Sequence, residues 1–273
     1  MSYENLHLIT AWDQVVQLRE SDFLTPAEVL LLESAQIGTA AKIGLTVPNL
    51  RAPHVLIRAQ SQRYLILGGC KDFRTQPSGI TVYGAWIAGT LDLSFTTARA
   101  PIDLFNCDFA ERPQMAQLQA DGLAIVGSNL ADGINAARIQ ILGDLSLNVS
   151  KVDGKVALSG SDIKGYLSCT QATLRNAEGS AFKAQGMKVA SSVLLEETTA
   201  SGQFSLLGAQ IGGQLVAIGA AFHNPDGHAL NVQSAQIHGD VFLRYAQADG
   251  EVSFVGVEVG GAFDCSHATL RTT

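Results

Sequence analysis

The sequence has little charge and few aromatic residues for its length. Of its 273 residues, 16% are charged and 7% are aromatic, whereas 47% are hydrophobic. A typical globular domain carries about 25% charged residues. Intrinsic disorder requires low hydrophobicity and high charge, so that class is excluded. The net charge is −7, and the sequence contains no run of Lys and Arg. A general nucleic-acid binder needs a basic stripe, so we expect no direct nucleic-acid binding.

Long hydrophobic runs and targeting segments are also missing. No apolar stretch approaches the roughly 18–20 residues that a membrane span requires. The apolar run at residues 29–32 is short and lies between Glu28 and Glu33. The N-terminus has neither a basic start nor an apolar signal core. These absences predict a cytoplasmic protein without a membrane segment.

Cysteine is scarce, and its spacing matches no metal site. Cys70, Cys107, Cys169 and Cys265 are 37, 62 and 96 residues apart, and none forms a CxxC pair. We interpret them as unpaired thiols in a reducing compartment. A GxGxxG fingerprint is missing too, so no dinucleotide site is implied.

The clearest local signal in the first seventy residues is a helix start. Thr25 can accept hydrogen bonds from the free N–H groups, Pro26 suits the first helical position, and Glu28 completes a capping box. Gly38 is a plausible end for this helix.

Two further helices are expected near this one. One begins at Thr10, and another runs from about residue 54 to residue 67 and ends at Gly68 and Gly69. Residues 71–78 form a polar connection. We therefore predict that residues 1–78 are a helical N-terminal cap region.

From residue 79 the chain changes to short alternating runs that are typical of strands. Residues 165–212 align without a gap with residues 213–260, a period of 48 residues, and a third copy begins at Gly261. Within the unit, apolar positions alternate and a glycine turns the corner, as in residues 203–212 and 251–260. Copies of this kind must stack to bury their apolar faces.

The repeat predicts a mainly β fold, a parallel β-solenoid or β-helix over residues 79–273. We expect two coils of about 24 residues per unit and about eight coils in all, with an α-helical N-terminal cap. At the strand spacing of about 4.8 Å, the rod would be about 40 Å long. Residues 175–179 and their copy at 224–227 form a turn insertion. It recurs in every second coil, so the insertions should lie along one edge, where we expect any repeated binding ridge.

The segments at residues 57–69, 79–93, 106–109 and 250–270 resemble a family of bacterial repeat proteins that is common in actinobacteria. Its members are often labelled "membrane-associated oxidoreductase". The segment Gly-Ile-Thr-Val-Tyr-Gly-Ala-Trp-Ile-Ala-Gly-Thr-Leu-Asp-Leu at residues 79–93 is an example. The resemblance implies coils rather than chemistry, and it transfers no catalytic residue to this chain. The corners are more distantly similar to those of pentapeptide-repeat proteins.

The thiols are expected to pack in the core. Cys169 and Cys265 share a repeat position with Ala217, which indicates a small inward-facing slot. Four coils, about 19 Å, separate the two cysteines, so a disulfide between them is excluded by its limit of about 7 Å between Cα atoms. We interpret Cys107 and Cys70 in the same way.

The histidines and carboxylates suggest no catalytic or metal site. His223 and His228 flank the second insertion as solvated loop residues, and His238 and His267 are the other histidines of the repeat. Asp144 and Asp240 share a repeat position with Ser192 but would lie about 19 Å apart. The remaining carboxylates are expected to face solvent, with the first two on opposite faces of a strand: Glu196, Glu197, Asp162, Asp249, Glu251 and Glu258. No Ser/His/Asp order stands out, and we predict no catalytic, cofactor-binding or metal residues.

Three function hypotheses follow. The first is a non-enzymatic interaction or scaffold module with an unknown protein partner. The second is an enzyme that acts on a carbohydrate or small molecule, whose signature would be a concave groove with two carboxylates close together. The third is an acidic DNA-mimicking rod that binds a topoisomerase-like partner. The chain stops about 13 residues into a new unit. Either the product is short, or the chain is truncated, or the open end pairs with something, which makes an end-to-end homodimer a further hypothesis.

Overall fold

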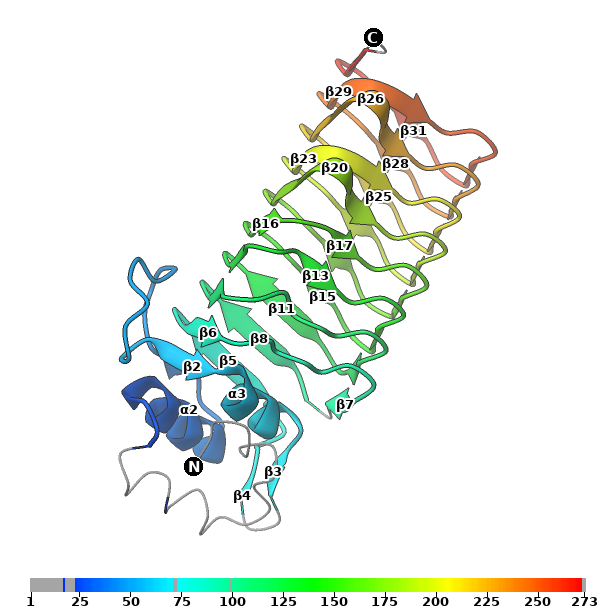
Figure 1. Cartoon of the computed structure of the whole chain (residues 1–273). Helices are drawn as coiled ribbons and strands as arrows, with labels where there is room; N and C mark the ends of the chain where they lie inside the picture. Colours follow the sequence, from blue (N-terminus) through cyan, green and yellow to red (C-terminus); the bar gives the residue numbers. More distant parts are fainter. Residues whose placement is uncertain (1–16, 18–22, 71–72, 99, 272–273) are drawn as a thin grey trace.

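The structure is a computed structural model that describes residue 17 and residues 23–70, 73–98 and 100–271. It is a straight β-solenoid of about nine turns, with the helices at its N-terminal end (Figure 1). The predicted fold class is therefore confirmed. Strands make up 41% of the structure and helices 9%.

Helix α2 (Pro26–Ile37) begins and ends as the sequence predicts. The Thr25 hydroxyl accepts from the Glu28 backbone N–H at 3.1 Å, and the Glu28 carboxylate accepts from the Thr25 N–H at 3.0 Å. Gly38 ends the helix with a left-handed φ of 75°. Glu28 is fully buried and also accepts from Arg58 Nε at 2.7 Å. This buried ion pair ties the helix to the first strands of the solenoid.

Helix α3 (Ala59–Ile66) is shorter than the predicted helix at residues 54–67. Residues 56–58 instead form β2 (Leu56–Arg58), which pairs in parallel with a solenoid strand. β1 (Ala41–Lys42) also pairs with the solenoid, so the first turn starts inside the region predicted to be a helical cap. The turns number about nine where we expected about eight, because the first turn starts early and most turns are shorter than 24 residues. The helix predicted at Thr10 lies outside the described residues.

Three parallel sheets run along the rod, and most turns contribute a strand to each of them. The 10-stranded sheet is β1, β5 (Ile80–Tyr83), β8 (Ile102–Phe105), β11 (Leu123–Val126), β15 (Leu145–Ser146), β19 (Leu167–Ser168), β22 (Val193–Leu194), β25 (Leu215–Val216), β28 (Val241–Phe242) and β31 (Phe263–Asp264). The 8-stranded sheet is β7 (Thr97–Ala98), β10 (Gln119–Ala120), β14 (Gln140–Ile141), β18 (Asp162–Ile163), β21 (Lys188–Val189), β24 (Gln210–Ile211), β27 (Gln236–Ile237) and β30 (Glu258–Val259).

The 12-stranded sheet carries the longest strands. It consists of β2, β6 (Trp86–Ala88), β9 (Asp108–Phe109), β12 (Asn129–Leu130), β13 (Ile134–Asn135), β16 (Lys151–Asp153), β17 (Val156–Ala157), β20 (Thr173–Lys183), β23 (Thr199–Ser205), β26 (Ala221–Asn231), β29 (Gln247–Ser253) and β32 (Thr269–Arg271). β3 (Gly69–Cys70) and β4 (Phe73–Arg74) form a separate antiparallel pair. β4 lies within the predicted polar connection at residues 71–78, and β3 lies just before it.

The register shows that the two turns of each repeat unit differ in length. Leu167 pairs with Val193 across a long turn, and Val193 pairs with Leu215 across a turn that is shorter by four positions. The same alternation continues through Val241 to Phe263. The unit therefore consists of two turns of about 24 residues, as expected, and the insertion makes one of them 26 positions long and the other 22. The long turns hold the insertion, and the earlier turns resemble the short ones.

The core is a set of aliphatic rows with one aromatic row. Phe182 and Phe204 are paired on neighbouring turns and stack with ring centroids 4.3 Å apart, and Phe222, from a different inward row, packs edge-on with its centroid 5.3 Å from that of Phe204. Glycine turns one corner as predicted, since Gly208 and Gly256 have left-handed φ values of 63° and 67°. These stacked turns hold outward side chains of the 12-stranded sheet in straight rows, one strand spacing apart.

Candidate functional site

The part of the interior that the structure describes offers no reactive thiol. Cys107 and Cys169 are fully buried, and this burial raises the pKa of each thiol to about 12. Four turns separate Cys169 from Cys265 by the register of their strands, which is too far for a disulfide. Cys265 is exposed, which corrects our expectation of a packed core thiol. Its turn is the last described one, and its apolar neighbours Phe263 and Leu270 are also 47% exposed. The Cys70 side chain is outside the described part.

The side chains at the repeat position of Asp144, Ser192 and Asp240 link successive turns by hydrogen bonds. The Asp144 carboxylate accepts from the backbone N–H of Tyr166 in the next turn, at 2.8 Å. The Ser192 hydroxyl and the Asp240 carboxylate accept equivalent bonds, from Gln214 at 3.0 Å and Ala262 at 2.8 Å. A glycine precedes each donor, and a Cβ atom there would overlap the accepting side chain. The repeated glycines Gly165, Gly213 and Gly261 are therefore required by this contact.

Most other carboxylates have surface partners. Glu196 accepts from the Thr170 hydroxyl at 3.0 Å and Glu197 from the Gln171 amide at 2.8 Å. Glu196 and Glu197 lie in a turn, where Glu197 has a φ of 55°, rather than on the strand that we had assumed. Asp162 pairs with Lys164, and Glu258 accepts from Gln236.

Two histidine–carboxylate pairs link β26 to β29. Nδ1 of His223 lies 2.8 Å from Oδ2 of Asp249, and Nδ1 of His228 lies 3.2 Å from Oε2 of Glu251. These histidines are therefore partnered strand residues rather than loop residues that contact only solvent. Of the other two, His238 has its Nδ1 3.2 Å from the Ile211 carbonyl oxygen, and the ring of His267 stacks on that of Tyr245.

The insertions at residues 175–179 and 224–227 form two matching crests on one edge of the 12-stranded sheet. Each interrupts the register of a long strand, β20 or β26. The amide of Asn176 donates to the Ser180 carbonyl, and that of Asn224 to the His228 carbonyl, both at 2.9 Å. In each following turn a glycine, Gly202 or Gly250, passes against the crest backbone. The expected repeated ridge is present, and we call residues 175–179 and 224–227 the insertion crests.

A hollow of about 520 Å³ lies beside the second crest. It is lined by Thr199, Ala221, Phe222, His223, Gln247, Ala248, Asp249, Thr269 and Arg271. The lining holds one carboxylate, that of Asp249. The pair of close carboxylates expected of a carbohydrate-cleaving groove is therefore not found in this lining.

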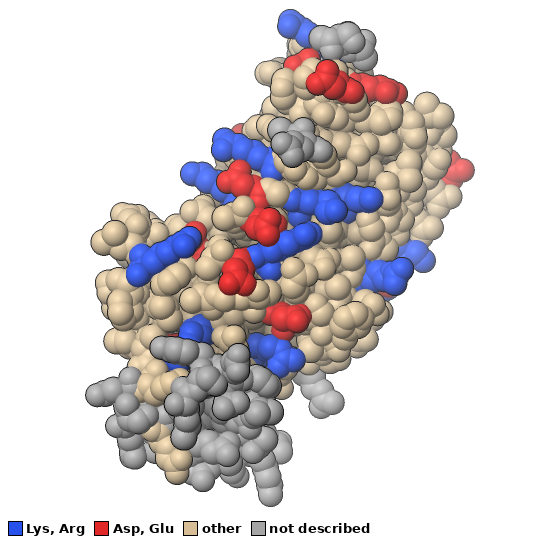
Figure 2. Space-filling view, viewed as in Figure 1, with Lys and Arg blue, Asp and Glu red and all other residues tan. Residues whose placement is uncertain are grey.

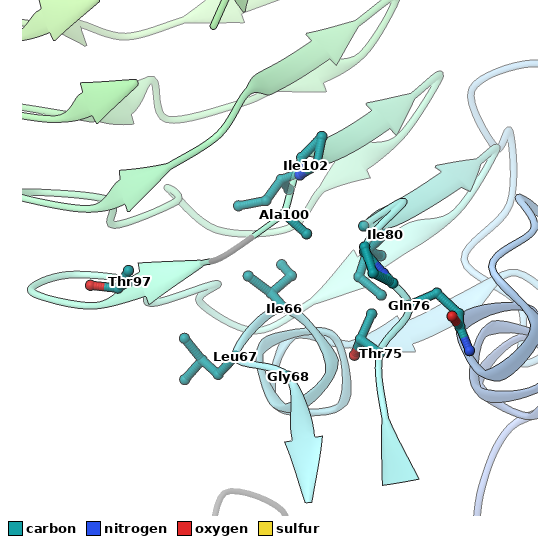
Figure 3. Close-up of a pocket in the computed structure, with 12 residues that line it drawn as sticks. Ile66, Leu67, Gly68, Thr75, Gln76, Ile80, Thr97, Ala100 and Ile102 are labelled. Atoms are coloured by element: carbon teal, nitrogen blue, oxygen red, sulfur yellow. The ribbon is translucent and has the colours of Figure 1, made fainter. Parts of the chain in front are cut away.

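A second hollow of about 280 Å³ lies between α3 and the first turns, with Ile66, Leu67, Ile80 and Ile102 around it (Figure 3). The polar side chains of Thr75 and Gln76 in its lining already donate hydrogen bonds. The Thr75 hydroxyl donates to the Leu65 carbonyl at 2.7 Å. This hollow offers apolar volume without a reactive group.

Within the described ranges, no group of three His, Cys, Asp or Glu side chains could hold a metal ion. The described helices are likewise too short or too polar to cross a membrane.

One arrangement of polar residues is missing from the sequence-based expectations. Ser201, His223 and Asp249 occupy paired positions on three consecutive turns. The sequence contains part of this arrangement, because Ser201 and Asp249 are 48 residues apart and so share a repeat position. Only the true turn length places His223 between them, since equal coils would have put Pro225 there.

Comparison with known proteins identifies no relative: no family model, curated protein or solved structure matches the chain.

Proposed function

We propose that this chain is an interaction module whose insertion crests bind a protein partner. The observation that carries the proposal is the identical construction of the two crests on alternate turns. Each crest lengthens its turn by four positions relative to the short turns. In each crest an asparagine amide donates a hydrogen bond to the carbonyl four residues later. Two turns separate them, which places them about 9.6 Å apart. Solenoids commonly use such regular surfaces for binding.

The charge distribution supports a protein partner of mixed charge. Arg175 and Asp226 are exposed on the first and second crest. On the face shown in Figure 2, Lys and Arg side chains lie between Asp and Glu side chains. An acidic DNA-mimicking rod would present a stripe of one sign, so this face gives that alternative no support. We also propose that the protein is cytoplasmic and that two chains can pair end to end. We propose as well that the chain is related to the bacterial repeat family that its segments resemble.

A charge-reversal variant tests the crests. We expect the full chain to capture a reproducible protein from the native cell lysate, and the double variant Arg175→Glu with Asp226→Lys to lose it. Both side chains are exposed, so the fold should be unaffected.

The matched control is Lys188→Glu, a charge reversal on the exposed face of the 8-stranded sheet. It should retain the partner. Equal capture by all three proteins would contradict the role of the crests, and no reproducible capture by the unmodified chain would contradict the proposal as a whole.

A further inference from the structure

The 8-stranded sheet begins one turn later than the other two sheets. The 10-stranded sheet starts at β1 and the 12-stranded sheet at β2, whereas the first strand of the 8-stranded sheet is β7, which follows β5 and β6 in the next turn. Among the described strands, β7 pairs with β10 alone. Its other side is therefore an open edge at the N-terminal end of the sheet, and we call it the β7 edge.

The edge is open because the chain leaves the path of the solenoid in the first turn. After β2 it forms α3 and the antiparallel pair of β3 and β4, and it rejoins the rod at β5. β5 pairs with β8 at a distance of 22 positions, so Thr75 and Gln76 correspond to the two residues of β7. Their N–H groups donate elsewhere, to the Gly68 carbonyl at 3.4 Å and the Ala35 carbonyl at 3.5 Å. These two residues therefore do not continue the sheet beyond β7.

The β7 edge presents one backbone donor and one backbone acceptor, both from Thr97. The Gln119 N–H donates to the Thr96 carbonyl at 2.9 Å, so the pairing with β10 uses the groups on either side of Thr97. In a parallel sheet the N–H and C=O of one residue point to the same neighbouring strand. Those of Thr97 therefore point away from β10, and within the described residues neither has a hydrogen-bond partner. An edge of this kind is a template for pairing with another strand.

The hollow of about 280 Å³ borders the β7 edge. Thr97 lines it together with apolar side chains from the end of α3 and from the start of β5 and β8, namely Ile66, Ile80 and Ile102 (Figure 3). The described residues of the lining include no Asp, Glu, Lys, Arg or His. A charged group would lose hydration there without gaining a partner. The hollow is therefore suited to uncharged, apolar side chains that arrive with a strand.

We propose that the β7 edge binds an extended peptide of a partner protein as an added parallel strand. One peptide residue lies opposite Thr97. The Thr97 N–H donates to the carbonyl before that residue, and the Thr97 carbonyl accepts from the N–H after it. The two flanking side chains point inward, as that of Ala98 does, and enter the hollow. The peptide therefore has apolar residues on both sides of a polar one. In strand addition the main-chain bonds supply affinity and the side-chain pockets supply specificity. This surface is separate from the insertion crests and does not depend on them.

The probe is a peptide copied from a strand of the same sheet. Residues 138–142, Arg-Ile-Gln-Ile-Leu, contain β14, in which Ile139 and Ile141 are buried on either side of the exposed Gln140. We expect the fluorescein-labelled peptide to bind the full chain, measured by fluorescence anisotropy. Thr97→Pro removes the N–H of the edge and should weaken binding at least about fivefold. Proline is tolerated on an edge strand, and circular dichroism melts check that the variant is folded.

The matched control is Thr97→Val, which changes the side chain but keeps the N–H, and it should bind the peptide as tightly as the unmodified chain does. A second measurement leaves the protein unchanged. The same peptide, N-methylated at its second isoleucine, cannot donate to the Thr97 carbonyl and should also bind at least about fivefold more weakly.

Three results would overturn the proposal. The first is that the unmodified chain does not bind the peptide. The second is that the folded Thr97→Pro variant binds it as tightly as the unmodified chain, because the peptide would then occupy another edge. The third is that the N-methylated peptide binds equally well, because the hollow would then accept an apolar group without strand pairing.

Discussion

At the scale of single residues, burial decides which polar groups can react. Cys107 and Cys169 lie in fully buried slots between turns, so their thiolates would lose hydration without gaining a charged partner. His223 and Asp249 lie on the outer face and stay accessible. The sequence predicted the burial of Cys169 from the small repeat slot, and it predicted that of Cys107 without such a slot. It could not predict the exposure of Cys265, because exposure depends on what packs against that turn.

Alkylation tests the difference between these thiols. At pH 8 we expect iodoacetamide to modify Cys265 in the folded protein but leave Cys107 and Cys169 unmodified until denaturant is added. The pKa of each buried thiol is about 12 when folded, compared with about 8.5 when free. Their stabilising effect is therefore complete below about pH 8.5 and is lost as the pH rises toward 12. Peptide mass spectrometry checks the sites, and native labelling of Cys169 as fast as Cys265 would contradict the buried slot.

At the scale of the structural elements, contacts between corners fix the stacking of turns. The bonds from Tyr166, Gln214 and Ala262 to the preceding turn occur at the same place in three units. The sequence repeat located the three glycines beside them, but their cause appears only in the structure. The matching glycines show that the residue type at this position is restricted. They do not show which contact restricts it, because the accepting side chain lies a whole turn away in the sequence.

Gly213→Ala tests this contact. Its Cβ would overlap Ser192 Oγ and lie 3.0 Å from the Ser191 carbonyl carbon, so the turns must move apart. We expect the free energy of unfolding to fall by about 1–3 kcal/mol, as in other overpacked sites. Urea denaturation followed by circular dichroism measures it.

The control for this variant is Gly208→Asn. Gly208 has no neighbouring atom within 4 Å of its added Cβ, and asparagine tolerates its left-handed φ. The change should therefore stay within about 0.5 kcal/mol. Equal losses in the two variants would contradict contact between turns as the reason for the glycine.

At the scale of the whole molecule, the alternation of long and short turns determines which residues meet. The length of the two-turn unit is evident from the sequence, because Ser201 and Asp249 occupy equivalent positions in successive units. Its division into two turns of about 24 residues, one of them with an insertion, was also expected, but the register of 26 and 22 positions appears only in the structure. The solenoid class was therefore predictable, whereas the row of Ser201, His223 and Asp249 was not.

Engineered disulfides test this alternation most directly. In a Cys265→Ser background, Thr173→Cys with Thr199→Cys should oxidise readily, because Thr173 and Thr199 are paired across neighbouring strands. Their Cα atoms lie about 4.8 Å apart, within the range of about 4.4–6.8 Å that a disulfide requires. The comparison pair is Thr173→Cys with Glu197→Cys, which two coils of equal length would bring together. The alternating turns predict the first crosslink without the second. Formation of the second without the first would contradict the register and every row of residues built on it.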